Sequence, residues 1–247
     1  MKISLITICW NSERALKRTL DSVMEQTRRP DEYVFVDGGS TDGTMSILED
    51  FKTKAERMKM DVRILQQHRT EGAAGIPDAW NQGIDNVKGD VIGLLNSDDW
   101  YEPTALESVK TALTEHPECG AASCPVRFMN ENGNVVKVSY PKCLGLFLPF
   151  LMPVPHPGLF VRKTTYDSIG KYNVTYKISA DYDFVWRFYR ARLKLAYVEK
   201  AQVNMELGGL ANSSRELARN ETLEIARCHG AGFLARIAWL LRKISGR

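Results

Sequence analysis

The chain has 247 residues, 44% of them hydrophobic and 26% charged, and its formal net charge is +3. This composition excludes an intrinsically disordered chain, and so weak a positive charge gives no reason to expect a nucleic acid as partner. The length allows one large α/β domain or two small ones, with enough chain to bury a substantial core.

Five cysteines are present, an odd number without the paired CxxC spacing of a zinc site. They are Cys9, Cys119, Cys124, Cys143 and Cys228. We expect free, mostly structural thiols in a reducing compartment. The N-terminal apolar run becomes charged at Glu13, which makes it too short for a signal sequence or a membrane span. The sequence therefore predicts a cytoplasmic protein.

The first half of the chain alternates predicted strands with predicted helices. Runs rich in Val, Ile, Leu and aromatic residues predict strands at residues 3–8, 33–36 and 91–95. Apolar spacing predicts helices at residues 13–27, from 44 onward, at about 73–87, and from Pro103, which suits a first helical position. As far as residue 126, this alternation predicts a parallel sheet with right-handed crossovers.

The pattern changes after residue 126. The stretch NENGNVVKVSY (residues 130–140) predicts a turn and a strand, and residues 158–162 predict another strand. Short helices are expected at about 164–169 and 181–192. We expect this half to be an α+β extension built onto the same sheet, because no clear linker precedes it.

Two apolar segments each allow two interpretations. Residues 144–158 are strongly apolar and broken by prolines, which fits core packing or an exposed loop beside an acceptor with a lipid tail. From Arg215 the chain is predicted to be helical, and after Glu224 it contains only basic charges. These are Arg227, Arg236, Arg242, Lys243 and Arg247. Such a helix can lie on an anionic membrane surface or pack on the domain with a solvated basic face.

Polar residues cluster where predicted strands end. Residues 7–11 follow the first strand, DGGSTDGT (residues 37–44) the second, and NSDDW (residues 96–100) a later one. In open α/β sheets ligands bind at the carboxyl ends of strands. Asp37, the last residue before its turn, could accept hydrogen bonds from a base or ribose. The alternative for this stretch is a tight turn feeding a helix, and it does not match the GxGxxG dinucleotide fingerprint.

Asp98 and Asp99 raise an electrostatic question of their own. Two adjacent carboxylates repel one another if they are buried without a partner, and a divalent cation would remove that repulsion. Mg²⁺ or Mn²⁺ commonly binds through one or two carboxylates together with phosphate oxygens and waters. The alternative is a solvated turn, in which pairs of acidic residues are frequent.

Five ordered blocks of this sequence resemble a known family. They are VDGGSTDGT, GIPDAWNQGI, LLNSDDWYEP, HPGLFVRK and SADYDFVWRF. In this order they resemble the inverting family 2 glycosyltransferases, in particular the branch that builds bacterial exopolysaccharide or lipopolysaccharide, over about residues 1–205. The resemblance implies a GT-A fold, Rossmann-like, with a mixed, mainly parallel sheet flanked by helices. We expect this domain over residues 1–210, with a nucleotide-binding half at about 1–126 and an acceptor half at about 127–210. C-terminal helices would follow, as a basic amphipathic segment at residues 211–247.

The resemblance also implies roles for individual residues on the donor side. Thr7, Asn11 and Asp37 would hold the nucleoside, and Asp78 would contact the donor. Asp98 and Asp99 would form the DxD-type pair, one facing ribose or diphosphate and the other binding Mg²⁺ or Mn²⁺. Which of the two binds the metal stays open, because Asn96 occupies the first position of that motif.

Asp181 stands where the family has its catalytic base, just before Trp186 in the same predicted helix. The family usually has Glu-Asp there, whereas this chain has Ala180 before Asp181. The alternative is an acidic residue that stabilises a helix N-terminus. Trp186 and His156 are candidates for the acceptor side, and His156 could equally be structural. Pro77 and Trp80 depart from the family pattern, so the sugar-side loop is expected to be reshaped.

The expected function is the metal-dependent transfer of one sugar, with inversion, from a nucleotide-sugar to a hydroxyl of a glycan or glycolipid acceptor. UDP is the favoured nucleotide, and the membrane contact would be peripheral, on the inner face of the cytoplasmic membrane. The QxxRW block of processive synthases is absent, which favours single additions.

One alternative is a non-catalytic nucleotide-sugar binding module. A nucleotidyltransferase would need a glycine-rich basic loop near the N-terminus, which TICWNSE does not provide. The oligomeric state is left open.

Overall fold

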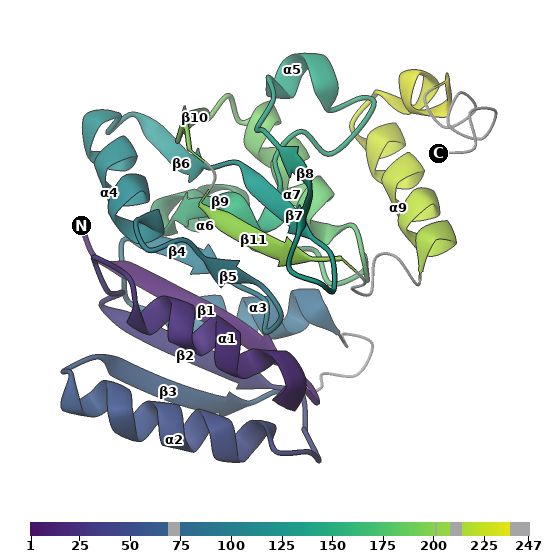
Figure 1. The fold of residues 1–247 in the computed structure, drawn as a ribbon. Helices are drawn as coiled ribbons and strands as arrows, with labels where there is room; N and C mark the ends of the chain where they lie inside the picture. Colours follow the sequence, from purple (N-terminus) through teal and green to yellow (C-terminus); the bar gives the residue numbers. More distant parts are fainter. Residues whose placement is uncertain (69–74, 201, 208–213, 238–247) are drawn as a thin grey trace.

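A seven-stranded sheet dominates the part of the chain that the computed structural model describes, namely residues 1–68, 75–200, 202–207 and 214–237 (Figure 1). Its order is β10-β6-β9-β4-β1-β2-β3. The strands are β1 (Ile3–Cys9), β2 (Glu32–Asp37), β3 (Asp61–Gln66), β4 (Val91–Leu94), β6 (Cys119–Ser123), β9 (Leu159–Arg162) and β10 (Lys194–Tyr197). Only β9 runs against its neighbours β4 and β6 among these paired strands. The predicted mainly parallel α/β sheet is thus confirmed, and β9 and β10 from the second half of the chain extend it. The strand predicted within residues 130–140 does not join this sheet and belongs to a second one.

Helices cover both faces of this sheet. Three pack on one face: α1 (Glu13–Met24), α2 (Thr44–Arg57) and α4 (Ala105–Glu115). Three others pack on the opposite face, α3 (Ile76–Asp85), α6 (Lys163–Ile169) and α7 (Ala180–Arg190), and α9 (Arg215–Cys228) lies beside α7. Side chains of β2 alternate between the two apolar layers, Tyr33 and Phe35 on one side and Val34 and Val36 on the other, as expected for a strand buried on both faces.

Helix ends differ from their predicted positions for identifiable reasons. α1 stops at Met24 rather than at residue 27, because the Thr27 N–H donates to the Pro103 carbonyl at 2.8 Å and the Gln26 side chain bonds to Glu102 and Leu106. The same contacts hold Pro103 outside α4, which begins at Ala105. α7 ends at Arg190, and Arg192 after it has a left-handed backbone with φ 56°.

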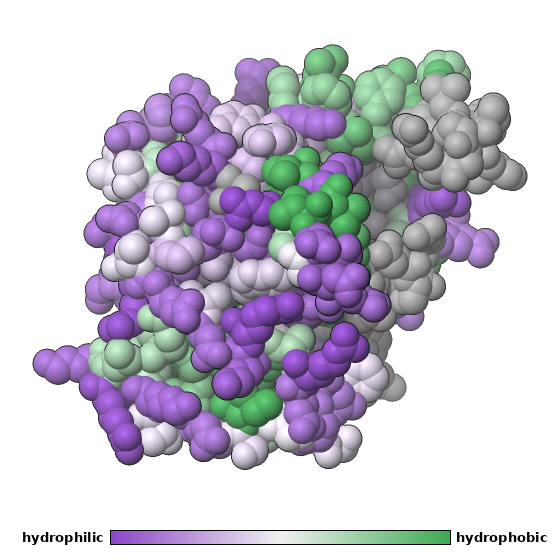
Figure 2. Space-filling model, in the orientation of Figure 1, coloured by the Kyte–Doolittle hydropathy of each residue, from purple (hydrophilic) through white to green (hydrophobic). Residues whose placement is uncertain are grey.

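A second, four-stranded sheet crosses the edge of the main one, in the order β5-β11-β7-β8. It contains β5 (Trp100–Tyr101), β11 (Val203–Glu206), β7 (Val126–Met129) and β8 (Val135–Ser139). The predicted turn and strand at residues 130–140 are the turn between β7 and β8 and β8 itself. The edge strand β8 exposes Val135 and Val136, which form an apolar strip on the surface (Figure 2).

The segment at residues 144–158 is partly buried. It contains α5 (Leu144–Phe147) and the 3₁₀ turn η1 (His156–Gly158). Leu144 and Leu148 are buried, whereas Leu146 is 63% exposed. Gly158 is held against the Cys124 carbonyl so closely that a Cβ there would lie 2.4 Å from that oxygen.

The predictions for the cysteines and for the C-terminal helix are confirmed where the structure describes them. All five thiols are free, and Cys9, Cys119 and Cys124 are buried. The predicted helix from Arg215 is α9, and residues 232–237 are also helical. The basic residues Arg242, Lys243 and Arg247 lie outside the described residues. Within the described part, no helix is long and apolar enough to cross a bilayer.

Candidate active site

Three polar turns meet at the carboxyl edge of the main sheet, as the sequence predicted. β4, β1 and β2 are parallel neighbours, so the turns that follow them lie side by side. The Ser12 hydroxyl, after β1, is 2.8 Å from the Ser97 hydroxyl, after β4. The Ser12 N–H donates to the Thr44 hydroxyl, at the end of the turn after β2, at 2.8 Å. Hydrogen bonds therefore join all three turns into one structure.

Asp37 organises the turn that follows β2. Its side chain is 1% exposed, and its carboxylate accepts hydrogen bonds from the Gly39 N–H (2.8 Å), the Ser40 N–H (2.9 Å) and the Ser40 hydroxyl (2.5 Å). Gly39 has φ 90°, a conformation that favours glycine. Asp37 therefore fits both interpretations made from the sequence. It is a carboxylate at a ligand-binding strand end, and it also holds the tight turn together.

Asn11 connects the turn after β1 with the same loop. Its backbone is left-handed (φ 49°), which asparagine tolerates better than most residues. Its side-chain oxygen accepts from the Thr41 N–H at 2.9 Å, and its own N–H donates to the Ser40 hydroxyl at 2.9 Å. Asn11 is exposed, so a ligand at the strand ends can reach it.

Asp98 and Asp99 have different surroundings although they are adjacent. The Asp99 side chain is 1% exposed, accepts weakly from the Asn96 amide (3.4 Å), and receives a backbone hydrogen bond from Glu206. Burial, followed by repulsion from Asp98, raises the pKa of Asp99 well above its usual range. Asp98 is only half-buried; burial and repulsion from Glu206 raise its pKa. Asp98 is therefore the carboxylate that a ligand can reach.

The surroundings of Asp98 include two charged residues that the sequence did not single out. Arg18, on α1, forms an ion pair with Glu206 at the end of β11 and donates to the Asp98 carbonyl at 3.1 Å. Its guanidinium also lies 3.7 Å from the centre of the Trp100 ring. Arg18 thus holds the turn after β4 against the second sheet. Its three partners, Glu206, Asp98 and Trp100, are far from it in sequence, and no local motif marks the contacts.

The oxygen atoms around Asp98 supply some, but not all, of the ligands that a divalent cation needs. The Asn96 side-chain oxygen, in the same turn as Asp98, is buried and has no hydrogen-bond partner among the described residues. Oxygen atoms of this kind suit Mg²⁺ or Mn²⁺. Within the described ranges, no three His, Cys, Asp or Glu side chains converge on one point. A cation here would therefore need further oxygen ligands from a substrate and water.

α3 carries Asp78, which is almost buried. Its carboxylate accepts from the side chains of Gln67 (3.0 Å) and Gln82 (2.8 Å). Asn81, one turn along, exchanges two hydrogen bonds with the backbone of Tyr172: its amide donates to the Tyr172 carbonyl (2.8 Å) and its oxygen accepts the Tyr172 N–H (2.9 Å). Asn81 therefore has a structural role, and α3 links the strand ends to the segment that leads into α7.

Asp181 lies in the first turn of α7 and is half-buried. Burial raises the pKa of its carboxyl to about 6, and repulsion from Glu221 adds to this, although the Tyr182 N–H, 2.8 Å away, stabilises the ionised form. A carboxylate with such a pKa can accept a proton near neutral pH. The helix dipole alone would have stabilised the charge and lowered the pKa.

Three of the predicted site residues have side chains that pack against the rest of the protein; Thr7 and Trp186 are buried, and His156 is half-buried. Thr7 is fully buried, and its hydroxyl lies 2.7 Å from the Tyr33 hydroxyl. Trp186 is 4% exposed and stacks on His229. His156 stacks on Trp80 with ring centres 4.3 Å apart, and burial lowers its pKa to about 4, which keeps the ring neutral. The structure does not bring the side chains of Thr7 and Trp186 to the surface of the site.

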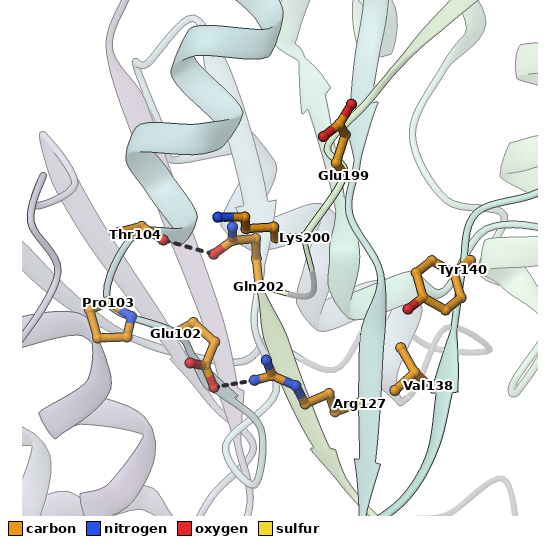
Figure 3. Close-up of a pocket in the computed structure, with 9 residues that line it drawn as sticks. All are labelled: Glu102, Pro103, Thr104, Arg127, Val138, Tyr140, Glu199, Lys200 and Gln202. Atoms are coloured by element: carbon orange, nitrogen blue, oxygen red, sulfur yellow. Dashed lines mark hydrogen bonds and ion pairs between the residues drawn. The ribbon is translucent and has the colours of Figure 1, made fainter.

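A pocket of about 440 Å³ lies beside β7 and β8 of the second sheet (Figure 3). Two of its walls are joined by the ion pair between Arg127 and Glu102 (2.6 Å) and by the hydrogen bond from Thr104 to Gln202 (3.2 Å). None of the predicted site residues lines it. The carboxylates at the strand ends and this pocket are thus separate features.

Comparisons with known proteins decide the family. The family description Glycosyl transferase family 2 matches residues 4–192. The chain belongs to glycosyl transferase family 2. A PGL/p-HBAD biosynthesis glycosyltransferase of Mycobacterium bovis is 30% identical to this glycosyltransferase over 216 residues, which cover 85% of this chain and 79% of the relative. GlyA, a glycosyltransferase of Streptococcus pneumoniae, is 34% identical over 115 residues, covering 47% of this chain and 15% of GlyA.

Solved structures confirm the fold of this glycosyltransferase. A fragment of S. aureus TarS in complex with UDP-GlcNAc superposes with a TM-score of 0.72 at 22% identity, over 95% of this chain and 67% of the fragment. The UDP complex of TarS gives a TM-score of 0.70 at 21% identity, over 93% of this chain and 65% of the fragment. The chain thus spans about two thirds of the TarS fragment. The GT-A fold predicted from the sequence blocks is confirmed.

Proposed function

We propose that this glycosyltransferase moves one sugar from a UDP-sugar to a hydroxyl of a glycan or lipid-linked acceptor, with inversion, in the synthesis of a bacterial surface polysaccharide or glycolipid. Family membership supports the transfer chemistry. The TarS complexes with UDP and UDP-GlcNAc support a UDP-sugar donor. The Mycobacterium bovis relative, named for PGL/p-HBAD biosynthesis, supports an acceptor of the same broad kind.

The raised pKa of Asp181 is the observation that carries this proposal. An inverting transfer needs one carboxylate that removes the proton from the acceptor hydroxyl as it attacks the anomeric carbon. Asp181 has a pKa of about 6 because it is largely surrounded by protein at the start of α7. At neutral pH it is ionised and yet a stronger base than an ordinary aspartate, which suits a proton acceptor.

The donor would lie across the three strand ends. Asn11 and the loop ordered by Asp37 would face the nucleoside, and Asp78 would support this side through Gln67 and Gln82. Asp98 and the side-chain oxygen of Asn96 would hold the cation. Asp99, buried behind them, would fix the turn against β11. A bound Mg²⁺ or Mn²⁺ would supply Lewis-acid neutralisation of the diphosphate leaving group.

A screen of nucleotide-sugars tests the proposal. The chain is incubated with UDP- and GDP-sugars, with and without Mn²⁺, and both thermal stability and nucleotide release are measured. We expect a UDP-sugar to raise the melting temperature; at 100 times its dissociation constant the stabilisation is about 2.7 kcal/mol. NMR of the product anomeric carbon then reports inversion. No thermal shift and no nucleotide release with any donor would count against the proposal.

We also propose a peripheral contact with anionic membranes through the C-terminal part of the chain. Phe233 is 77% exposed, and Leu234 and Ile237 are partly exposed in the same helical stretch, next to Arg236. Apolar side chains lie along the upper edge of the molecule near α5, at Leu146, and in this C-terminal stretch (Figure 2). Exposed apolar side chains beside basic ones suit the surface of an anionic bilayer. Binding to lipid vesicles measures this contact directly.

A further inference from the structure

A buried carboxylate on α9 holds the chain segment that leads into α7. The Glu221 side chain is 7% exposed and accepts hydrogen bonds from three consecutive backbone N–H groups. The Lys177 N–H donates to it at 2.7 Å, that of Ile178 at 2.9 Å and that of Ser179 at 2.8 Å. Asp181 lies two residues further along the chain. Three bonds to one side chain restrain this turn more strongly than a single hydrogen bond would.

Ser179 adds a second link between the same two elements. It is the N-cap residue of α7, yet its hydroxyl makes no capping bond within that helix. The hydroxyl donates instead to the Ala218 carbonyl on α9 at 3.1 Å and lies 3.4 Å from the Thr222 hydroxyl. Serine normally caps the helix that it begins. Here its side chain joins two helices, and α9 therefore fixes the start of α7.

The charge of Glu221 also acts on Asp181. In the pattern that the sequence resembles, Asp181 would have an acidic neighbour at position 180, where this chain has Ala180. Glu221 brings a second carboxylate to this end of α7 from a different helix, and its repulsion is one of the causes of the raised pKa of Asp181. Tyr172, just ahead of α7, is a second titratable group that interacts with Asp181. Glu221 thus has both a geometric and an electrostatic effect.

We propose that Glu221 is a positioning residue for Asp181, which it acts on through the backbone of residues 177–179 and through its negative charge. The proposal rests on the proposed role of Asp181 as the base. The C-terminal helix α9 would then be part of the catalytic unit of this glycosyltransferase.

The substitution Glu221→Gln tests this, because it keeps the size of the side chain and removes its charge and half of its acceptor capacity. We expect kcat to fall by about 10- to 100-fold, the loss typical of a small misplacement of a catalytic group, with little change in KM for the donor. The acid limb of the pH–rate profile should move to lower pH, because one repelling charge near Asp181 is gone. Glu224→Gln is the matched control: it removes an exposed carboxylate from the same helix and should leave kcat and the acid limb as in the wild type.

A measurement that needs no substrate separates this proposal from that of the function. The side-chain carbon of Asp181 is followed by ¹³C NMR against pH in the intact chain, and its signal is assigned by its loss in Asp181→Asn. In Glu221→Gln the titration should move to lower pH. An unchanged titration and an unchanged acid limb in that variant would overturn the inference, whatever the donor screen gives. A shifted titration in a chain without transferase activity would leave the effect of Glu221 on Asp181 standing and would refute the proposed function instead.

Glu221→Asp covers the case in which Glu221→Gln does not fold. Aspartate keeps the charge and loses one methylene of reach, so kcat should fall while the acid limb stays near its wild-type position. A lower kcat together with a limb at lower pH would contradict the electrostatic part of the proposal, and full activity would contradict the geometric part.

Discussion

Adjacent acidic residues in this glycosyltransferase differ in what they can do. Asp98 is half-buried and open to a ligand, whereas Asp99 is 1% exposed and interacts with Asn96 and the backbone of β11. The sequence left the choice between them open. Which of the two side chains is exposed depends on how the turn after β4 packs against the second sheet, and that contact is not visible in the sequence. We therefore propose that Asp98 contacts the metal and that Asp99 has a structural role.

Asp98→Asn should weaken Mn²⁺ binding in the presence of UDP by at least about tenfold, because a neutral amide replaces the only accessible carboxylate of the pair. Isothermal titration calorimetry measures the affinity. Asp99→Asn is the comparison: it should change Mn²⁺ affinity less, since an amide oxygen can still accept the hydrogen bonds of the buried side chain. An equal loss of affinity in the two variants would refute this division of roles.

Asp181→Asn should abolish most activity and yet stabilise the protein at neutral pH. The pKa of about 6 in the folded chain lies above the ordinary value of 3.8, so ionisation is harder in the folded than in the unfolded state. Stability from this group is complete below about pH 4 and is lost as pH rises through about 6. We expect Asp181→Asn to be more stable than the wild type by about 1–3 kcal/mol at pH 7.5, and equally stable at pH 3.5.

Urea denaturation at the two pH values measures this difference, and a transfer assay should show a loss of about 10²- to 10⁴-fold. Asp167→Asn, at an exposed position on α6, is the control and should change neither quantity. Full transfer activity in Asp181→Asn would exclude it as the base.

Among the secondary-structure elements, α3 has the most connections between distant parts of the site. Asp78 faces the strand ends, Trp80 stacks on His156, and Asn81 bonds twice to the backbone of Tyr172. Since Tyr172 precedes α7 in the chain, α3 is hydrogen-bonded to the segment that leads to Asp181.

Asn81→Ala should lower the free energy of unfolding by about 1–3 kcal/mol, because the N–H and the carbonyl of Tyr172 both lose their partner. Urea denaturation measures the change. Asn86→Ala, which removes one exposed hydrogen bond at the end of the same helix, should cost much less. Equal losses in the two variants would show that the Tyr172 contact contributes little.

Elements with strong local patterns could be predicted from the sequence, and those formed by distant contacts could not. β1, β2 and β4 are continuous apolar runs, and α1 shows a clear apolar face at Leu16, Leu20 and Val23. β6 consists of small residues (CGAAS) and β5 of only two, so neither has a pattern of its own. The site residues divide in the same way. The carboxylates at strand and helix ends could be predicted from the sequence, whereas Arg18, Glu206 and Glu221 could not, because they act through contacts between distant parts of the chain.

At the scale of the whole molecule, the proposed membrane contact lies on one edge, near α5 and the C-terminal stretch. Phe233→Asp should reduce binding to vesicles that contain an anionic lipid, because it places a charge where the exposed ring would enter the bilayer. Met58→Asp, a similar change at an exposed side chain beyond α2, should leave binding unchanged. Cosedimentation with anionic and with neutral vesicles measures both. Equal binding to the two kinds of vesicle would refute an electrostatic contribution.

The position of β9 has a consequence for how this protein is made in a cell. β9 pairs with β4 on one side and β6 on the other, although both of those strands precede it by many residues. Until residues 159–162 have left the ribosome, the nascent chain carries two strand edges with unpaired backbone groups, which are prone to join other chains. We therefore expect the main sheet to close only after residues 159–162 have been synthesised, because β9 fills the position between β4 and β6.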